Sequence, residues 1–272
     1  AGGVVGTGVG AYVFVDGTSP SLTTSIGTLS TASDPTKNLT PKITYTATDK
    51  NLLNVQISVD GKSNIVGNVG SYTVPSGMIT TSGKHSIKVT ATDKAGNTTV
   101  KEYFLYVDIT APNIKNAAIT PETNNSIVTN NKEPEVTWQI TDSDFKKLEV
   151  LVDGSDIYET NDQAITSYKI PEGTLTTSGN HKITLKAEDN VGNISEKKFE
   201  YYLDLNTPVF ETLEMSPTSN FLVPSKNLEP VINWEINEGI LSDISYSMDG
   251  VNYVSMGDNK NGSFKLPSSV FT

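Results

Sequence analysis

The chain has 272 residues, no cysteine and a formal net charge of −11 at pH 7. This length accommodates two or three domains of roughly 100 residues each, and the composition excludes disulfide bonds and thiol chemistry. The acidic balance disfavours nucleic acid and anionic lipid as partners, and no apolar run approaches the roughly 20 residues that a membrane-spanning helix needs.

The first predicted element is the strand AYVFVD at residues 11–16, which follows a glycine-rich stretch. Residues 1–20 align with residues 93–112, which close a longer repeat. We therefore expect residues 1–17 to be the terminal strand of a preceding repeat, or a strand donated to another copy of the chain. The alternative is that the chain was cut out of a longer array.

The next predicted strand recurs three times with an aromatic residue at its centre. Apolar and polar residues alternate around this aromatic, a pattern typical of a half-buried strand. The three copies are PKITYTA, PEVTWQI and PVINWEI, at residues 41–47, 134–140 and 230–236. Their central residues are Tyr45, Trp138 and Trp234. We interpret these aromatics as core anchors rather than as ligand-stacking rings.

The strands that follow recur in the same register. Each of the segments VQISVDG, LEVLVDG and ISYSMDG predicts a strand that ends in a tight Asp-Gly hairpin, at residues 55–61, 148–154 and 244–250. A further short strand closes at a proline, at residues 71–75, 167–171 and 263–267. Two more strand segments complete the first two copies, at residues 80–93 and 101–108 and at residues 176–189 and 197–204.

These elements amount to about seven short strands in a repeat of about 95 residues, which predicts an all-β chain of tandem immunoglobulin-like antiparallel β-sandwiches. We place the domains at residues 18–109, 110–205 and 206–272, the third incomplete because its last two strands are missing. The segments TDKAGN (92–97) and VDITAP (107–112) have counterparts at residues 188–193 and 203–208. These segments resemble the bacterial Ig-like repeats of large cell-surface and adhesin-type proteins.

The sequence contains no catalytic signature. The only histidines, His85 and His181, occupy equivalent repeat positions 96 residues apart. A catalytic pair is not expected at the same place in two copies of a repeat, so we interpret both as turn-to-strand residues. We expect no enzyme activity.

Acidic residues are predicted to converge where one repeat follows another. In an immunoglobulin-type domain, the loops after the second and sixth strands lie at the end where the chain enters, beside the linker. The first junction would gather Asp16, Asp49, Asp93 and Asn97; the second would gather Asp108, Asp142, Asp144, Asp189 and Asn193; the third would gather Asp204 and Glu238.

Oxygen ligands from three segments suit Ca²⁺, which takes about six to eight of them. Without a cation, carboxylates confined in this way repel one another. We therefore expect Ca²⁺ at the interdomain junctions, and the resemblance to repeats of giant adhesins implies the same. The alternative is that D-x-x-G-N forms only a hairpin turn, with Lys50 and Lys94 neutralising the neighbouring acids.

The resemblance implies a non-catalytic stalk module of a bacterial cell-surface protein, outside the cell and at its wall, with tandem domains forming a rod. Its partners would be a ligand on a host or neighbouring cell, or other copies of the chain. We expect no binding of nucleic acid and no membrane insertion. One alternative is an accessory, carbohydrate-binding segment of a secreted polysaccharide-acting enzyme. Another is a filament subunit assembled by strand donation.

Overall fold

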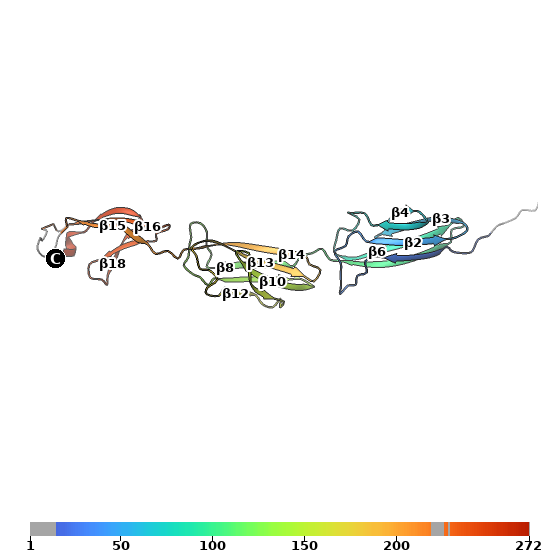
Figure 1. The fold of residues 1–272 in the computed structure, drawn as a ribbon, viewed down its shortest axis with the longest axis horizontal. Helices are drawn as coiled ribbons and strands as arrows, with labels where there is room; N and C mark the ends of the chain where they lie inside the picture. Colours follow the sequence, from blue (N-terminus) through green and yellow to red (C-terminus); the bar gives the residue numbers. More distant parts are fainter. Residues whose placement is uncertain (1–14, 219–225, 228, 272) are drawn as a thin grey trace, which may run out of the picture. The chain divides into compact units, whose positions relative to one another are not determined.

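The computed structural model describes residues 15–218, 226–227 and 229–271. Across these ranges the chain is built mainly from β-strands, as Figure 1 shows. The single helical element in the described ranges is the 3₁₀ turn η1 (Ser268–Phe271). No helix within the described part is long and apolar enough to cross a membrane. The predicted all-β class is confirmed. Most of the predicted strand at 11–16 lies outside the described residues.

The first repeat contains a three-stranded and a four-stranded antiparallel sheet. The sheet β1-β2-β5 consists of β1 (Ser21–Ile26), β2 (Lys42–Thr48) and β5 (Val69–Thr73). The sheet β4-β3-β6-β7 consists of β4 (Lys62–Val66), β3 (Leu52–Val59), β6 (Gly83–Asp93) and β7 (Thr98–Val107). Buried residues from both sheets form one hydrophobic core, which makes the repeat a sandwich.

The second repeat has the same two sheets in the same strand order. The three-stranded sheet is β12 (Ser167–Lys169), β9 (Glu135–Thr141) and β8 (Asn113–Thr120). The four-stranded sheet is β11 (Ser155–Thr160), β10 (Phe145–Val152), β13 (Gly179–Asp189) and β14 (Ile194–Leu203).

The third repeat has five described strands. One sheet is β15 (Val209–Ser216), β16 (Val231–Asn237) and β19 (Asn261–Lys265), and the other is β17 (Ile244–Ser247) and β18 (Tyr253–Gly257). Its core is small, and every residue of β15 is exposed.

The chain forms two compact units. The first is 1–112 with 142–146 and 188–194, and the second is 113–141, 147–187 and 195–272. The predicted domain boundaries follow the repeat and stay a prediction, although each sheet falls within one repeat.

The three central aromatics are core residues, as predicted. Tyr45, Trp138 and Trp234 expose only 6%, 2% and 6% of their surface. In β2 and β9 the burial pattern alternates residue by residue, because successive side chains of a strand point to opposite faces. The aromatic therefore faces the core together with the residues two positions before and two positions after it.

The predicted Asp-Gly hairpins occur in the first two repeats but not in the third. Asp60 and Gly61 have φ angles of 47° and 82°, as a tight turn between β3 and β4 requires. In the third repeat, β17 ends at Ser247 and β18 begins only at Tyr253. The Asp249 carboxylate there accepts hydrogen bonds from the backbone N–H groups of Val251 and Asn252, which shapes a wider loop. The prediction of a tight hairpin was wrong at this position.

Candidate metal sites at the linkers

The first cluster joins the linker before β1 to two loops of the first repeat. Asp16 precedes β1, Asp49 follows β2, and Asp93 is the last residue of β6. Each offers a carboxylate oxygen, and these oxygens all lie within 4.8 Å of one another. Asp93 is fully buried. Three segments that are distant in the sequence thus place negative charge in one small volume.

Asn97 ties the linker to the loop after β6. Its backbone N–H and side-chain amide donate to the two carboxylate oxygens of Asp93, each at 2.8 Å. The same amide donates to the backbone carbonyl of Asp16 at 3.0 Å. Burial favours the neutral form of Asp93, but the hydrogen bonds from Asn97 and from the backbone of the turn outweigh it and lower the pKa of this carboxyl. Asp93 is therefore ionised at neutral pH.

A second amide residue, Asn51, contacts the carboxylates of the first cluster. The side chain of Asn51 donates to Asp16 Oδ2 at 2.8 Å, and its backbone N–H donates to Asp49 Oδ1 at 2.7 Å. One amide residue thus contacts two of the three carboxylates. The sequence prediction omitted Asn51, although its position two residues after Asp49 is the usual geometry of an Asx turn.

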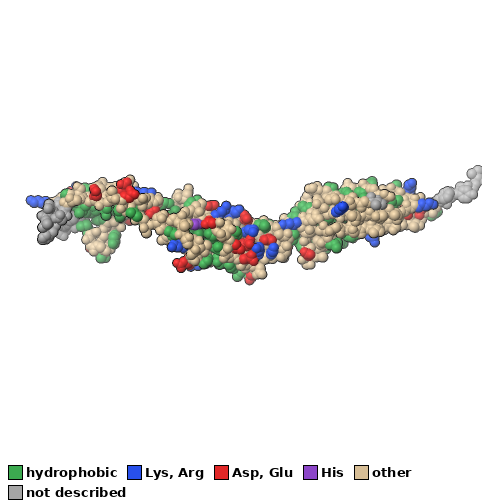
Figure 2. Space-filling model, viewed as in Figure 1, with side chains coloured by type: hydrophobic (Ala, Val, Ile, Leu, Met, Phe, Trp, Pro, Cys, Tyr) green, Lys and Arg blue, Asp and Glu red, His purple; other side chains and the backbone are tan. Residues whose placement is uncertain are grey.

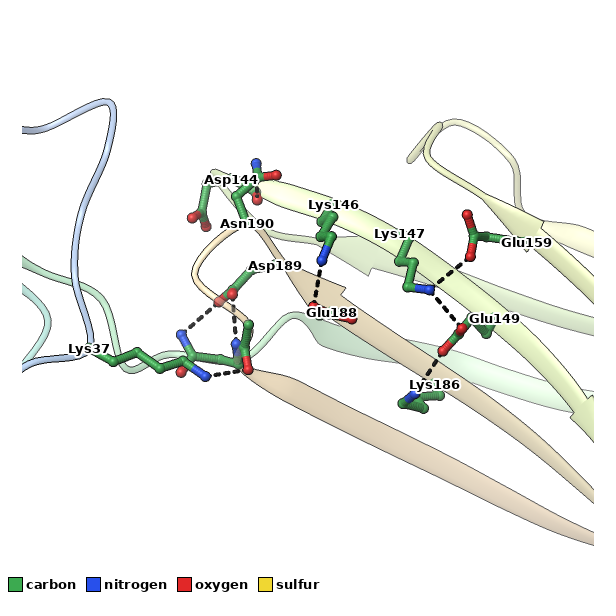
Figure 3. A network of polar contacts seen from close by, with 12 residues as sticks. Lys37, Asp144, Lys146, Lys147, Glu149, Glu159, Lys186, Glu188, Asp189 and Asn190 are labelled. Carbon is green, nitrogen blue, oxygen red and sulfur yellow. Dashed lines mark hydrogen bonds and ion pairs between the residues drawn. The ribbon is translucent and has the colours of Figure 1, made fainter. Parts of the chain in front are cut away.

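The second cluster repeats this arrangement at the next linker. Asp108, Asp144 and Asp189 offer carboxylate oxygens that lie within 4.8 Å of one another. Asn193 donates to both oxygens of Asp189 at 2.7 Å and to the backbone carbonyl of Asp108 at 3.3 Å. Figure 3 shows Asp144 and Asp189 on adjacent loops of the second repeat. All of these residues, like those of the first cluster, belong to the first compact unit.

Asp142 is placed differently from the other predicted residues of this cluster. It aligns with Asp49, and its Oδ1 accepts a hydrogen bond from the backbone N–H of Asp144 at 2.9 Å. Its first role is therefore to shape the loop that presents Asp144.

Asp144 is the unusual member of the cluster. Both of its carboxylate oxygens are buried, and neither has a hydrogen-bond partner. Burial and the negative charges of the neighbouring carboxylates of Asp189, Asp108 and Asp142 raise the pKa of Asp144 to about 7. A buried, unpartnered carboxylate beside other acids costs free energy, which a proton or a bound cation would offset.

The residues predicted at the third junction form no comparable cluster. Among the described residues, neither Asp204 nor Glu238 belongs to a group of three or more carboxylates that could share an ion. Asp204 accepts a hydrogen bond from the backbone N–H of Asn206 at 3.0 Å, and Glu238 accepts one from Gly239. Each carboxylate therefore shapes its own turn.

A third acidic group, absent from the sequence prediction, lies on the hairpin of β10 and β11. It comprises Glu149, Asp156 and Glu159. Lys147 bridges Glu149 and Glu159 at 2.7 and 2.8 Å, and Lys186 reaches Glu149 at 2.8 Å (Figure 3). Acidic and basic side chains likewise lie side by side over the second repeat in Figure 2. Because lysines neutralise it, this group is an ion-pair network of the sheet surface.

Each histidine makes hydrogen bonds that hold the Asp-Gly hairpin of its own repeat, and the two do so at equivalent positions. His85 Nδ1 lies 2.7 Å from Asp60 Oδ2, and Nε2 lies 2.9 Å from the carbonyl oxygen of Thr81. His181 makes the same two contacts, with Asp153 and Thr177. Both partners are acceptors, so the protonated ring satisfies both. Burial lowers the pKa of His85, but the bonds with Asp60 and Thr81 outweigh it and raise the pKa above 6.5.

The comparison with protein families gives one result. The description "bacterial Ig-like domain" matches residues 19–110 and 107–205, which together span more than half of the chain. No match was found among curated proteins.

Several solved structures are similar to this chain at low identity. The fibronectin(III)-like modules of Clostridium thermocellum CbhA are 18% identical over 67% of this chain and 94% of theirs, with a TM-score of 0.34. A Ca²⁺-stabilized adhesin with which an Antarctic bacterium binds ice is 15% identical over 94% of this chain and 68% of its own, with a TM-score of 0.36. A 1.5-MDa bacterial ice-binding adhesin is 12% identical over 94% of this chain and 90% of its own, with a TM-score of 0.35.

Proposed function

Because the chain belongs to the bacterial Ig-like domain family, we propose that it is a non-catalytic stalk module of a bacterial cell-surface protein whose linkers are fastened by Ca²⁺. Tandem Ig-like domains support a structural role. The finer proposal is that the bound cation stiffens the array into a rod that holds an adhesive surface away from the cell, toward a ligand on another cell or toward further copies.

One observation carries this proposal: the same three segments meet at two successive linkers. At each linker the carboxylate of a linker residue, Asp16 or Asp108, meets carboxylates from the loops after the second and sixth strands. At the second linker, both oxygens of Asp144 are buried without a donor. Hard oxygen ligands from several loops are what Ca²⁺ takes. An ion there would hold the linker against both loops.

The cation part is tested by thermal unfolding and small-angle scattering, with Ca²⁺ and with chelator. A ligand that binds only the folded chain adds about 2.7 kcal/mol of stability at a concentration of 100 Kd. We expect Ca²⁺ to raise the melting temperature and to narrow the distribution of interdomain orientations. Identical melting and scattering curves in both conditions would contradict the proposal.

Two matched variants distinguish the effect of losing a linker carboxylate from the general effect of removing one negative charge. Asp108→Asn removes one carboxylate of the second cluster but keeps an oxygen to accept from Thr110 N–H, a bond of 2.8 Å. Glu159→Gln removes one carboxylate of the lysine-neutralised group. We expect the first variant to lose part of the Ca²⁺-induced stabilisation and the second to keep all of it.

A further inference from the structure

The two linker clusters differ at one position that contacts the carboxylates directly. Asn51 in the first repeat and Asp144 in the second both lie two residues after an aspartate whose Oδ1 accepts their backbone N–H, at 2.7 and 2.9 Å. Their backbone carbonyls also play the same part, because each accepts a backbone N–H from the loop after the sixth strand, that of Lys94 or Asn190. The two side chains therefore enter equivalent clusters from equivalent backbone.

The amide of Asn51 and the carboxylate of Asp144 act in opposite ways on their clusters. Asn51 donates its amide to Asp16 Oδ2 at 2.8 Å, so it partners a carboxylate of its cluster. Asp144 has no hydrogen to donate when ionised, and its two buried oxygens have no partner. The first cluster thus supplies its own donor, whereas the second adds one more acceptor.

Lysines lie near both clusters, but they come from different positions of the repeat. Lys50 and Lys94 line the open cavity beside the first cluster, together with Asp16 and Asp49. The aligned positions in the second repeat are Ser143 and Asn190, which carry no charge. Lys37 instead reaches the loop after the sixth strand of the second repeat, where it donates to the backbone carbonyl of Gly192. The difference between the clusters therefore lies in the carboxylates, because the second cluster has Asp144 where the first has Asn51.

We infer that the side chain at the position of Asn51 and Asp144 sets cation affinity, so that the second linker binds a hard divalent cation much more tightly than the first. This inference rests on the proposed function. The array then responds to the cation unevenly. Asn97 and Asn193 tie both linkers through a backbone carbonyl, but only in the first does a further amide, that of Asn51, hold the linker carboxylate without an ion. At the second linker the bound ion takes the place of that amide.

The affinity part is tested by titrating CaCl₂ into the metal-free chain, by calorimetry and by native mass spectrometry. The wild-type chain should take up one ion at least about tenfold more tightly than any second, since the number of charged ligands tunes Ca²⁺ affinity. Asp144→Asn should weaken this tight site by at least about tenfold. Asn51→Asp should create a second tight site. Glu159→Gln is the control and should bind as the wild type does.

The metal-free chain gives an independent readout. In chelator, Asp144→Asn should raise the melting temperature, because it removes an unpartnered buried charge, and Asn51→Asp should lower it. Two ions of equal affinity in the wild type, or substitutions that leave the order of affinities unchanged, would overturn the inference while the proposed function stands. A wild-type chain that takes up no ion would overturn both.

Discussion

Replacing Trp138 by alanine tests the central packing argument of the second repeat. The side chain is 2% exposed in the middle of β9, with Val136 and Ile140 buried on the same face. A tryptophan buries roughly 150–250 Å², which at about 25 cal/mol per Å² corresponds to about 4–6 kcal/mol. Part of this area is already covered in a compact unfolded chain, and large-to-small changes of this kind cost about 3–5 kcal/mol. We expect Trp138→Ala to cost about 4 kcal/mol.

Amide hydrogen exchange with mass spectrometry is the suitable assay, because it reports stability region by region in a chain of several repeats. Peptides from β9 and β13 should lose about 4 kcal/mol of protection, whereas peptides from β2 and β6 of the first repeat should keep theirs. Ile127→Ala, at a side chain that is 58% exposed, is the control and should change protection little. A loss below about 1 kcal/mol in β9 would refute the burial argument and revive a surface role for this ring.

Two further predictions concern the histidine brace and the third repeat. In an NMR titration the pKa of His85 should lie above 6.5 and should fall in Asp60→Asn, while that of His181 stays unchanged as an internal control. Because the folded-state pKa is the raised one, His85 contributes stability below pH about 6.5 that is lost as the pH rises through that pKa; an unchanged pKa in Asp60→Asn would remove this account. Gly262→Ala should destabilise the third repeat by about 1–3 kcal/mol, since its new Cβ would lie 2.5 Å from Cζ2 of Trp234. Fluorescence-monitored urea unfolding would measure this, and wild-type stability would show that the ring can move away.

The sequence by itself determined the repeat, the strands and the core aromatics. Strands expected at 41–47 and 134–140 are observed one residue later as β2 and β9, and their aromatics are buried. Alternation with a period of two is a local property, so it can be read without knowing the partner strands. Repetition then supplied the alignment of the copies, since turns and strands recur in the same order at a spacing of about 95 residues. The convergence of linker and loop acids also followed from topology, because the strand order of a sandwich decides which loops share an end.

Only the tertiary structure decided how individual polar side chains are partnered. Asn51 and Asp144 align in the sequence, yet one closes its cluster with a hydrogen bond and the other is buried without one. Likewise the carboxylate of Asp249 turns back onto its own loop instead of completing a tight hairpin. Whether a carboxylate is satisfied depends on donors placed within about 3 Å by distant segments, and no local pattern encodes such distances.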